Sequence, residues 1–140
     1  PEAYPEHLEA GTQNIVGIAA LNAGIQYVQS HQKEIVEKEC FLLQKLYEGL
    51  SGYVEFYSSL ENSTPIVAIN IPGKDSAYVS DLLNYKYGIV TRCGAHCAPL
   101  MHKHLKTEER GIVRLSISFQ NTIEDIDFVV RAIQKISNDY

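Results

Sequence analysis

The sequence predicts an α+β fold in which a small, mostly antiparallel sheet carries helices on one of its faces. Long stretches with apolar residues at helical spacing stand at both ends of the chain, and short runs of strand-forming residues lie between them. Helices and strands alternate irregularly, which favours an α+β layer over repeated strand–helix–strand units. The 140 residues, 45% of them hydrophobic, suffice for one core. We therefore expect a single domain over residues 1–140.

The first third of the chain predicts two helices after an extended lead-in over residues 1–11. Thr12 is a suitable N-cap for the first helix, and Asn14 is a rival cap. Ser30 and His31 suggest a short break, after which a second helix should run over residues 32–50. The apolar positions are Ile15, Ile18, Leu21 or Asn22, Ile25 and Val28 in the first helix, and Ile35, Val36, Leu42, Leu43, Leu46 and Leu50 in the second.

The remaining elements follow from local signals. Asp75 or Ser76 should cap a helix that ends near Lys86, Pro99 should begin a short helix, and Thr122 should cap the last helix. Strands are expected over residues 53–57, 66–71, 89–92 and 112–119, where β-branched and aromatic residues concentrate. In the last of these strands, strict alternation places Arg114 on the face opposite the apolar residues.

Composition narrows the function. The formal net charge of -5 argues against a nucleic-acid partner, because phosphate-binding surfaces are usually basic. No apolar run approaches the roughly 20 residues that span a bilayer, so we expect no membrane insertion. The three cysteines, Cys40, Cys93 and Cys97, do not form a disulfide framework and favour a reducing, cytoplasmic location. The chain begins at Pro1 without a methionine, and we expect it to be a piece of a longer protein.

The segment from Arg92 to Leu100 (RCGAHCAPL) concentrates the reactive side chains of the chain. Cys97 is a candidate nucleophile, and Arg92 and His96, as cations or near-cations, would favour its thiolate. The alternative is an inert, buried cysteine. Zinc is a second alternative, since five possible ligands fall within twelve residues, but their spacing matches no usual zinc set and we expect no metal. These possible ligands are Cys93, His96, Cys97, His102 and His104. We place the last two histidines on a solvated helix end.

Two further positions could bind anions. The guanidinium of Arg114 could hold a carboxylate through two parallel hydrogen bonds, or it could form a structural ion pair. Gly11 and Thr12 precede a predicted helix, whose first amides and the threonine hydroxyl suit a phosphate group, although a plain N-cap is the alternative.

Three segments together resemble a known family. They are Glu9–Asn14 (EAGTQN), Arg92–Leu100, and Gly111–Ser116 (GIVRLS) with Asn121–Asp127 (NTIEDID). In this order and spacing they resemble the C-terminal domain of the class V aminotransferase group, in particular cysteine desulfurases and selenocysteine lyases. These are fold-type I enzymes that use pyridoxal 5'-phosphate (PLP). The resemblance spans nearly the whole chain.

The resemblance implies a role for each site residue. Thr12, with Gly11 before it, matches the threonine that binds the PLP phosphate, usually that of the opposite subunit of a homodimer. Cys97 matches the catalytic nucleophile that takes sulfur from L-cysteine as a persulfide and leaves L-alanine. Arg114 matches the arginine that holds the substrate carboxylate. His96 and Arg92 flank the nucleophile, as a catalytic and a substrate-binding candidate.

The resemblance also implies partners and limits. The substrate would be L-cysteine or selenocysteine, and an acceptor protein, such as an iron–sulfur cluster scaffold, would receive the sulfur. The family's Schiff-base lysine and the N-terminal cofactor domain are absent from these 140 residues, so we expect the chain alone to be inactive. Cys93 could capture the persulfide or merely fill space, and we favour the second role. The alternatives are another class V aminotransferase or lyase, which has no use for a nucleophilic thiol, and a non-enzymatic dimerisation or zinc-binding module.

Overall fold

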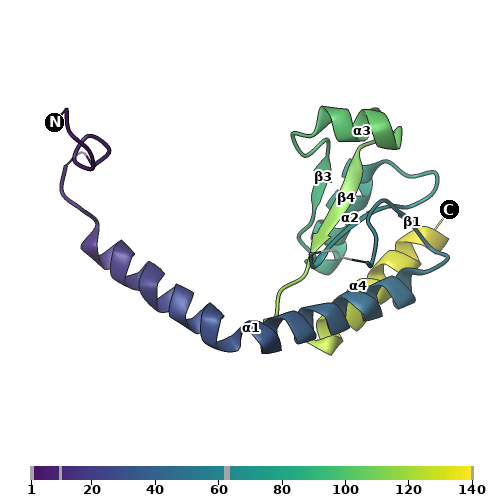
Figure 1. The fold of residues 1–140 in the computed structure, drawn as a ribbon. Coiled ribbons are helices and arrows are strands. Elements are labelled where there is room, and N and C mark those ends of the chain that lie inside the picture. The colour runs from purple at the N-terminus through teal and green to yellow at the C-terminus, as the bar shows by residue number, and fades with distance from the viewer. Residues whose placement is uncertain (1, 10, 62–63, 140) are drawn as a thin grey trace. The chain divides into compact units, whose positions relative to one another are not determined.

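The computed structural model describes residues 2–9, 11–61 and 64–139 (Figure 1). Their contacts divide the chain into two compact units, residues 1–35 and residues 36–140. The helices are α1 (Ile15–Leu50), α2 (Ser76–Tyr87), α3 (Pro99–Leu105) and α4 (Ile123–Asn138). The strands are β1 (Glu55–Phe56), β2 (Ile66–Asn70), β3 (Arg92–Gly94) and β4 (Ile112–Ser116).

Helix α1 begins at Ile15, because Asn14 and not Thr12 caps it. The Oδ1 atom of Asn14 accepts a hydrogen bond from the amide of Gly17 at 2.9 Å, which satisfies one of the free amides of the first turn. The expected cap at Thr12 is wrong, and the rival cap is right. The apolar stripe predicted for this part of α1 is exposed within this chain: Ile15, Ile18, Leu21, Ile25 and Val28.

The break expected at Ser30 and His31 is absent, and α1 is continuous through both residues. The hydroxyl of Ser30 donates to the carbonyls of Gln26 and Tyr27 at 2.9 and 3.0 Å. Nδ1 of His31 lies 2.9 Å from the Tyr27 carbonyl, and the two rings stack with centroids 4.3 Å apart. Both side chains therefore bond back to the preceding turn instead of ending the helix.

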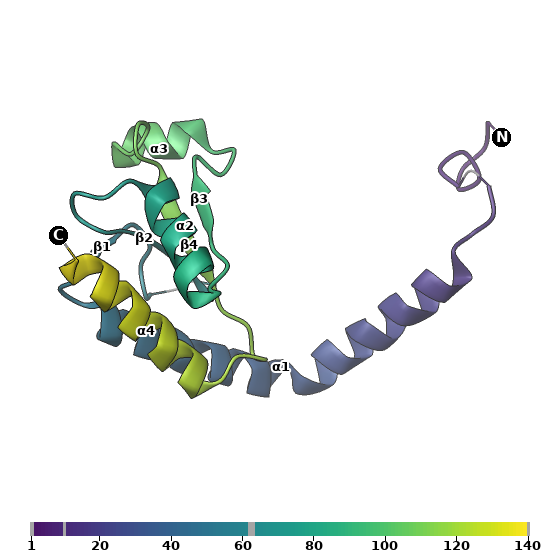
Figure 2. The same cartoon turned by 180° about the vertical axis from the view of Figure 1, so that it is seen from behind.

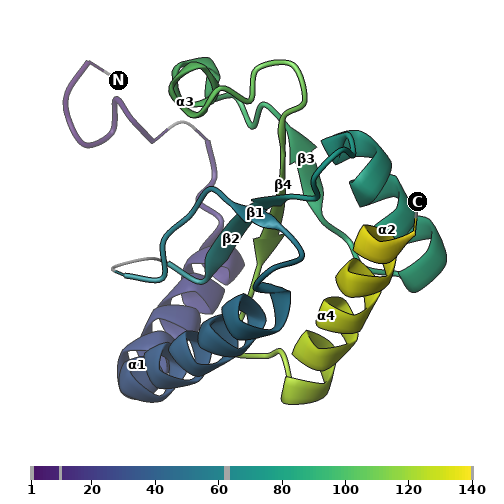
Figure 3. The same cartoon turned by 90° about the vertical axis from the view of Figure 1, so that its right-hand side faces the viewer.

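The four strands form one sheet in the order β1-β2-β4-β3, and every neighbouring pair is antiparallel. Val67 and Ile69 of β2 lie opposite Leu115 and Val113 of β4, so the apolar residues of both strands share one face. The helix α2 lies behind β4 in Figure 1 and in front of it in the reversed view of Figure 2. The helix α3 lies at one end of the sheet, away from α4 (Figure 3).

One core joins this apolar face to three helices, as the α+β prediction requires. The C-terminal part of α1 contributes leucines, and α2 and α4 contribute residues at helical spacing. The fully buried members are Leu42, Leu46, Leu50, Val67, Ile69, Ile71, Val79, Leu83, Val113, Ile133 and Ile136. Val36 was expected to face this core, but 50% of its surface is exposed.

Side-chain caps form at the predicted starts of α2 and α4. The Asp75 carboxylate accepts from the amides of Ala77 and Tyr78 at the start of α2. Thr122 and Asp125 form a reciprocal capping box at the start of α4. None of the helices in the described part of the chain is long and apolar enough to cross a membrane.

All four strands differ from the expected bounds, the second by one residue, since it ends at Asn70 instead of residue 71. The first is only Glu55–Phe56, the third is Arg92–Gly94 instead of residues 89–92, and the last ends at Ser116 instead of continuing to residue 119. The last strand ends because Asn121 folds back, with its side chain accepting from the amide of Ser118 at 2.9 Å.

Candidate functional site

The loop between β3 and α3 carries the candidate nucleophile in an unusual backbone conformation. His96 and Cys97 both adopt left-handed conformations, with φ of 50° and 59°, and Gly94, two residues before His96, has a φ of 90°. A left-handed conformation costs a residue with a side chain about 1–2 kcal/mol. The turn closes through the amide of Ala98, which donates to the Ala95 carbonyl at 2.9 Å. Two adjacent strained residues persist only where the surroundings hold them in place.

Cys97 is exposed, and a cation lies beside its sulfur. The Nη2 atom of Arg92 is 4.0 Å from Sγ of Cys97, and the pair is exposed to solvent. The alternative of a buried, inert cysteine is therefore wrong for this residue. A guanidinium at this position can donate a weak hydrogen bond to the sulfur and attracts it when it carries a negative charge.

His96 is held by the same arginine, but it does not supply a second cation. Its Nε2 lies 3.2 Å from the backbone carbonyl of Arg92, so this nitrogen carries the proton and donates it. Burial lowers the pKa of His96 below 6.5, and the charges of Arg114, Arg92 and His102 lower it further, against the opposing effect of the hydrogen bond. The imidazole is therefore neutral near pH 7, with Nδ1 as a proton acceptor. We expected His96 to be a cation or near-cation in this loop, and the direction of its pKa shift opposes the charged form.

Arg114 lies directly opposite Arg92 in the β3–β4 ladder, and both are on the sheet face away from the core. Like charges at opposite positions destabilise a sheet unless an anion lies between them. Among the described residues, neither guanidinium has a carboxylate partner. The Nε atom of the half-buried Arg114 is itself buried and has no hydrogen-bond partner. The structural ion pair that we considered for Arg114 is thus absent from the described part of the chain.

His102 is buried, contrary to the solvated position expected for it. Only 2% of its surface is exposed, whereas the neighbouring His104 is exposed as expected. Nδ1 of His102 lies 2.8 Å from the hydroxyl of Thr107, which is also buried, and the ring of His102 meets the ring of His96 edge-on at 6.2 Å. This pair could not be predicted from the sequence, because the seven-residue helix α3 is too short to show an apolar stripe.

Two glycines bring the strand before the loop close to the start of β4. A Cβ atom on Gly111 would lie 2.6 Å from Cα of Gly94, and the φ of Gly111 is +61°. Both the left-handed conformation and the close approach require glycine at position 111. A glycine that directly precedes an alternating strand is the signal that could have marked this position.

Cys93 does not share the face of the two arginines. It pairs with the core residue Val113, and alternation places it on the opposite side of β3 from Arg92. Among the described residues, all three cysteines are free thiols. No group of three His, Cys, Asp or Glu side chains within the described ranges is arranged to hold a metal ion.

Gly11 and Thr12 belong to the unit formed by residues 1–35, whereas the other candidate site residues belong to residues 36–140. Gly11 has a φ of +82°, and a Cβ atom there would meet no atom within 4 Å. Thr12 is exposed and precedes the start of α1 by three positions. Its hydroxyl has no hydrogen-bond partner among the described residues, so it is available to a ligand oxygen.

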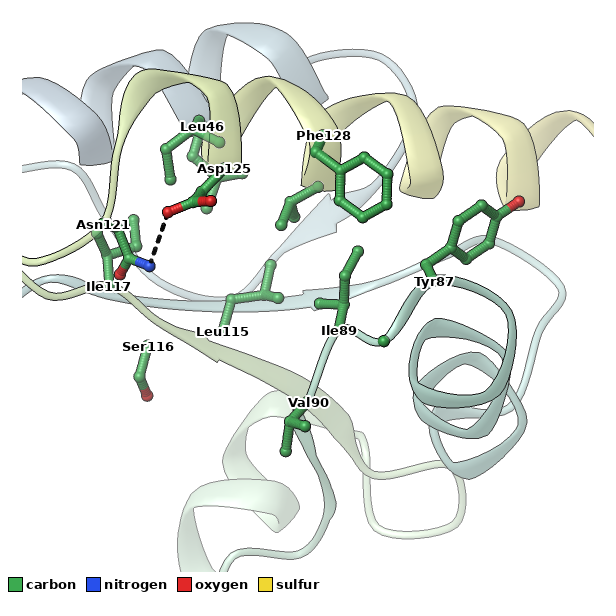
Figure 4. A pocket seen from close by; sticks show the side chains of 13 residues that line it. Leu46, Tyr87, Ile89, Val90, Leu115, Ser116, Ile117, Asn121, Asp125 and Phe128 are labelled. Carbon is green, nitrogen blue, oxygen red and sulfur yellow. Dashed lines mark hydrogen bonds between the residues drawn. The ribbon is translucent and has the colours of Figure 1, made fainter.

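A cavity of about 300 Å³ lies elsewhere, between α4 and the segment that follows α2 (Figure 4). Apolar side chains such as Tyr87, Ile89 and Phe128 line it, and Asn121 and Asp125 form a hydrogen bond at its edge. None of the residues assigned above to the candidate site lines this cavity.

A family model and curated relatives both place this chain near the class V aminotransferases. The family model "Aminotransferase class-V" matches residues 2–129. A probable cysteine desulfurase from Methanothermobacter thermautotrophicus is 33% identical over 97% of this chain, which covers 35% of that protein.

Solved structures give the same result. The apo structure of a cysteine desulfurase from Thermococcus onnurineus NA1 has a TM-score of 0.86 and 31% identity, covering 97% of this chain and 34% of that one. A cysteine desulfurase from Escherichia coli has a TM-score of 0.77 and 26% identity, covering 94% of this chain and 32% of that one. The chain thus spans about a third of the length of the relatives that it matches.

Proposed function

Because this chain belongs to the class V aminotransferase family, we propose that it is the C-terminal domain of a PLP-dependent cysteine desulfurase. The complete protein would remove sulfur from L-cysteine, or selenium from selenocysteine, and release L-alanine. The observation that carries the proposal is an exposed thiol beside a guanidinium at the end of a sheet face that bears two arginines without carboxylate partners. A transaminase has no use for such a thiol.

Arg114 is the proposed anchor of the substrate carboxylate. Its half-buried guanidinium lacks a partner at Nε, and a bound carboxylate would supply one while separating its charge from that of Arg92. Arg92 then lies near both the substrate carboxylate and the thiol, because it is opposite Arg114 and its Nη2 reaches the sulfur of Cys97. The pair explains why an amino acid would be held close to the thiol.

Cys97 is the proposed nucleophile. Its thiolate attacks the sulfur of the substrate, and a sulfur–sulfur bond forms as the carbon–sulfur bond breaks. The electron pair of the broken bond stays with the carbon skeleton, which takes up a proton to become alanine, and Cys97 keeps the transferred sulfur as a persulfide. Neutral His96, with Nε2–H bonded to the Arg92 carbonyl, offers Nδ1 to accept or return a proton.

Membership of the family implies that the full-length enzyme uses PLP, and the residues at the start of this chain suit the phosphate of that cofactor. The unengaged hydroxyl of Thr12 can donate to a phosphate oxygen, and the open backbone at Gly11 lets a phosphate approach closely. When bound, PLP supplies an electron sink for the substrate carbon. We place the Schiff-base lysine outside these 140 residues, in an N-terminal cofactor domain, and expect residues 1–140 to be inactive alone.

We further propose that the full-length protein is a cytoplasmic homodimer in which Thr12 serves the cofactor of the opposite subunit. The resemblance supports this assignment, as does the apolar surface that α1 exposes within this chain at Ile15, Ile18 and Leu21. The persulfide on Cys97 would pass to an acceptor protein, for example one engaged in iron–sulfur cluster assembly. The exposure of Cys97 is what such a transfer requires.

Alanine release from L-cysteine by the full-length protein tests the proposal. The wild-type protein and a Cys40→Ser control should release alanine with PLP bound, and Cys97→Ser should not. Equal turnover by Cys97→Ser would refute the desulfurase assignment and favour another reaction of the same family.

A further inference from the structure

The turn that carries Cys97 is joined to the body of the sheet through a chain of buried contacts that starts at His102. The amide of His102 donates to the Ala98 carbonyl at 3.1 Å, and its own carbonyl accepts from the amide of Thr107 at 2.9 Å. The side chains of His102 and Thr107 add the 2.8 Å contact between Nδ1 and the hydroxyl. His102 is therefore held by both its backbone and its ring.

Thr107 continues the chain into the two central strands. Its carbonyl accepts from the amide of Gly111 at 2.8 Å. The carbonyl of Gly111 in turn accepts from the buried Asn70 side chain of β2 at 2.8 Å. His102 is only 2% exposed. Its ring is bonded to Thr107 through Nδ1 and also contacts the ring of His96, with an interplanar angle of 79°.

We propose that His102 and Thr107 form a positioning pair for the desulfurase reaction, which hold the ring of His96 and through it the left-handed turn at Cys97. The inference rests on the proposed function. His96 is fixed at two points, by Nε2–H bonded to the Arg92 carbonyl and by the edge-on contact with His102. Because His96 and Cys97 are consecutive left-handed residues, the orientation of one restricts the other.

The burial of the pair gives it this role. A buried imidazole and a buried hydroxyl are stabilised by their mutual hydrogen bond, since a buried polar group without a partner costs free energy of folding. Replacing the Thr107 hydroxyl with a methyl group leaves His102 without its partner and free to shift. Misplacement of a catalytic group by about 1 Å can reduce a rate by roughly a hundredfold. A partial loosening should therefore be visible in kinetics before the fold is affected.

The test uses Thr107→Val in the full-length, PLP-loaded protein, with Thr107→Ser as the conservative variant and His104→Ala as the matched control on the exposed side of α3. Two readouts are followed: kcat for alanine release, and the rate at which iodoacetamide alkylates Cys97. Thr107→Val should lower kcat about tenfold with KM for cysteine unchanged, because Arg114 is intact. It should slow alkylation about threefold, since the sulfur loses its place beside Arg92. Thr107→Ser and His104→Ala should match the wild type.

A double-mutant cycle separates positioning from general stabilisation. If the pair acts through His96, Thr107→Val should have no further effect on alkylation in a His96→Ala background. An equal slowing in both backgrounds, or no slowing in either, overturns the proposal. His102→Gln, which removes the ring but keeps a polar group, should reproduce the loss and replaces Thr107→Val if that variant does not fold. The alkylation rate needs no turnover, so it decides this inference even if the wild-type protein releases no alanine and the desulfurase assignment fails.

Discussion

The Nη2 atom of Arg92 lies 4.0 Å from Sγ of Cys97, because the two left-handed residues in the middle of the loop, His96 and Cys97, turn the chain back toward the strand. This contact links the thiol to the face of the sheet that carries Arg114. A substrate that binds Arg114 through its carboxylate would therefore lie close to the sulfur that attacks it. The predictions below test this arrangement and the backbone that supports it.

Arg114 should govern the binding of the substrate. In the full-length enzyme, Arg114→Ala should raise KM for cysteine by roughly ten- to a hundredfold, since hydrogen bonds to charged groups contribute about 1.5–3 kcal/mol. Arg114→Lys should recover part of the loss, because lysine keeps the charge without the two-pronged geometry. Arg110→Lys is a matched control, as Arg110 is already paired with Glu55 at 2.7 Å. An unchanged KM in Arg114→Ala would contradict the assignment.

His96 should set the acid limb of the pH profile. Burial is the first cause of its lowered pKa, so protonation occurs below the ordinary value of 6.5. The neutral form, which can accept a proton at Nδ1, is present above this pKa and is lost as the pH falls through it. The kcat of the full-length enzyme should therefore be level near neutral pH and fall below pH 6.5.

The variant His96→Asn should lose this limb together with most of the activity, whereas His104→Asn should keep both. A limb that persists in His96→Asn would assign the titration to another group. A limb centred above pH 6.5 in the wild type would contradict the direction of the shift at His96.

Gly111 should be sensitive to substitution for two separable reasons. Gly111→Ala places a Cβ atom 2.6 Å from Cα of Gly94 at a φ of +61°, whereas Gly88→Ala meets nothing within 4 Å at a φ of +65°. The left-handed backbone should cost each variant about 1–2 kcal/mol. The steric conflict should cost Gly111→Ala about 1–3 kcal/mol more. Thermal unfolding measures the difference, and equal losses would show that the approach of the two strands is not restrictive.

Elements with local signals could be predicted from the sequence, and elements set by distant partners could not. The cap at Asp75 and the capping box at Thr122 set the starts of α2 and α4 through residues that are only two or three positions apart in the sequence. The bounds of β3 depend on where it pairs with β4, about twenty positions further on, so its apolar residues gave the wrong start. A break in the helix was predicted at Ser30 because the hydrogen bond from its hydroxyl to a preceding backbone carbonyl cannot be inferred from a pattern of residue types.

The candidate site divides in the same way. Arg92, His96 and Cys97 are close in the sequence, so their grouping was predictable, and the resemblance assigned Arg114 a role. The register that sets Arg114 opposite Arg92 is a property of the assembled sheet. The burial of His102 depends on Thr107 and on the loop packed around it, and a seven-residue helix carries too little periodicity to reveal it.

The most direct test of the account is the mass of the peptide that contains Cys97 after the full-length, PLP-loaded protein is mixed with L-cysteine. We predict that this peptide gains one sulfur atom, that reduction removes the sulfur, and that alanine appears in equal amount. This peptide also contains Cys93, so fragmentation in the mass spectrometer should place the added sulfur on Cys97, and the peptide with Cys40 should be unchanged. Alanine formed without sulfur on Cys97, or sulfur found on Cys93 instead, would contradict the assignment of Cys97 as the nucleophile.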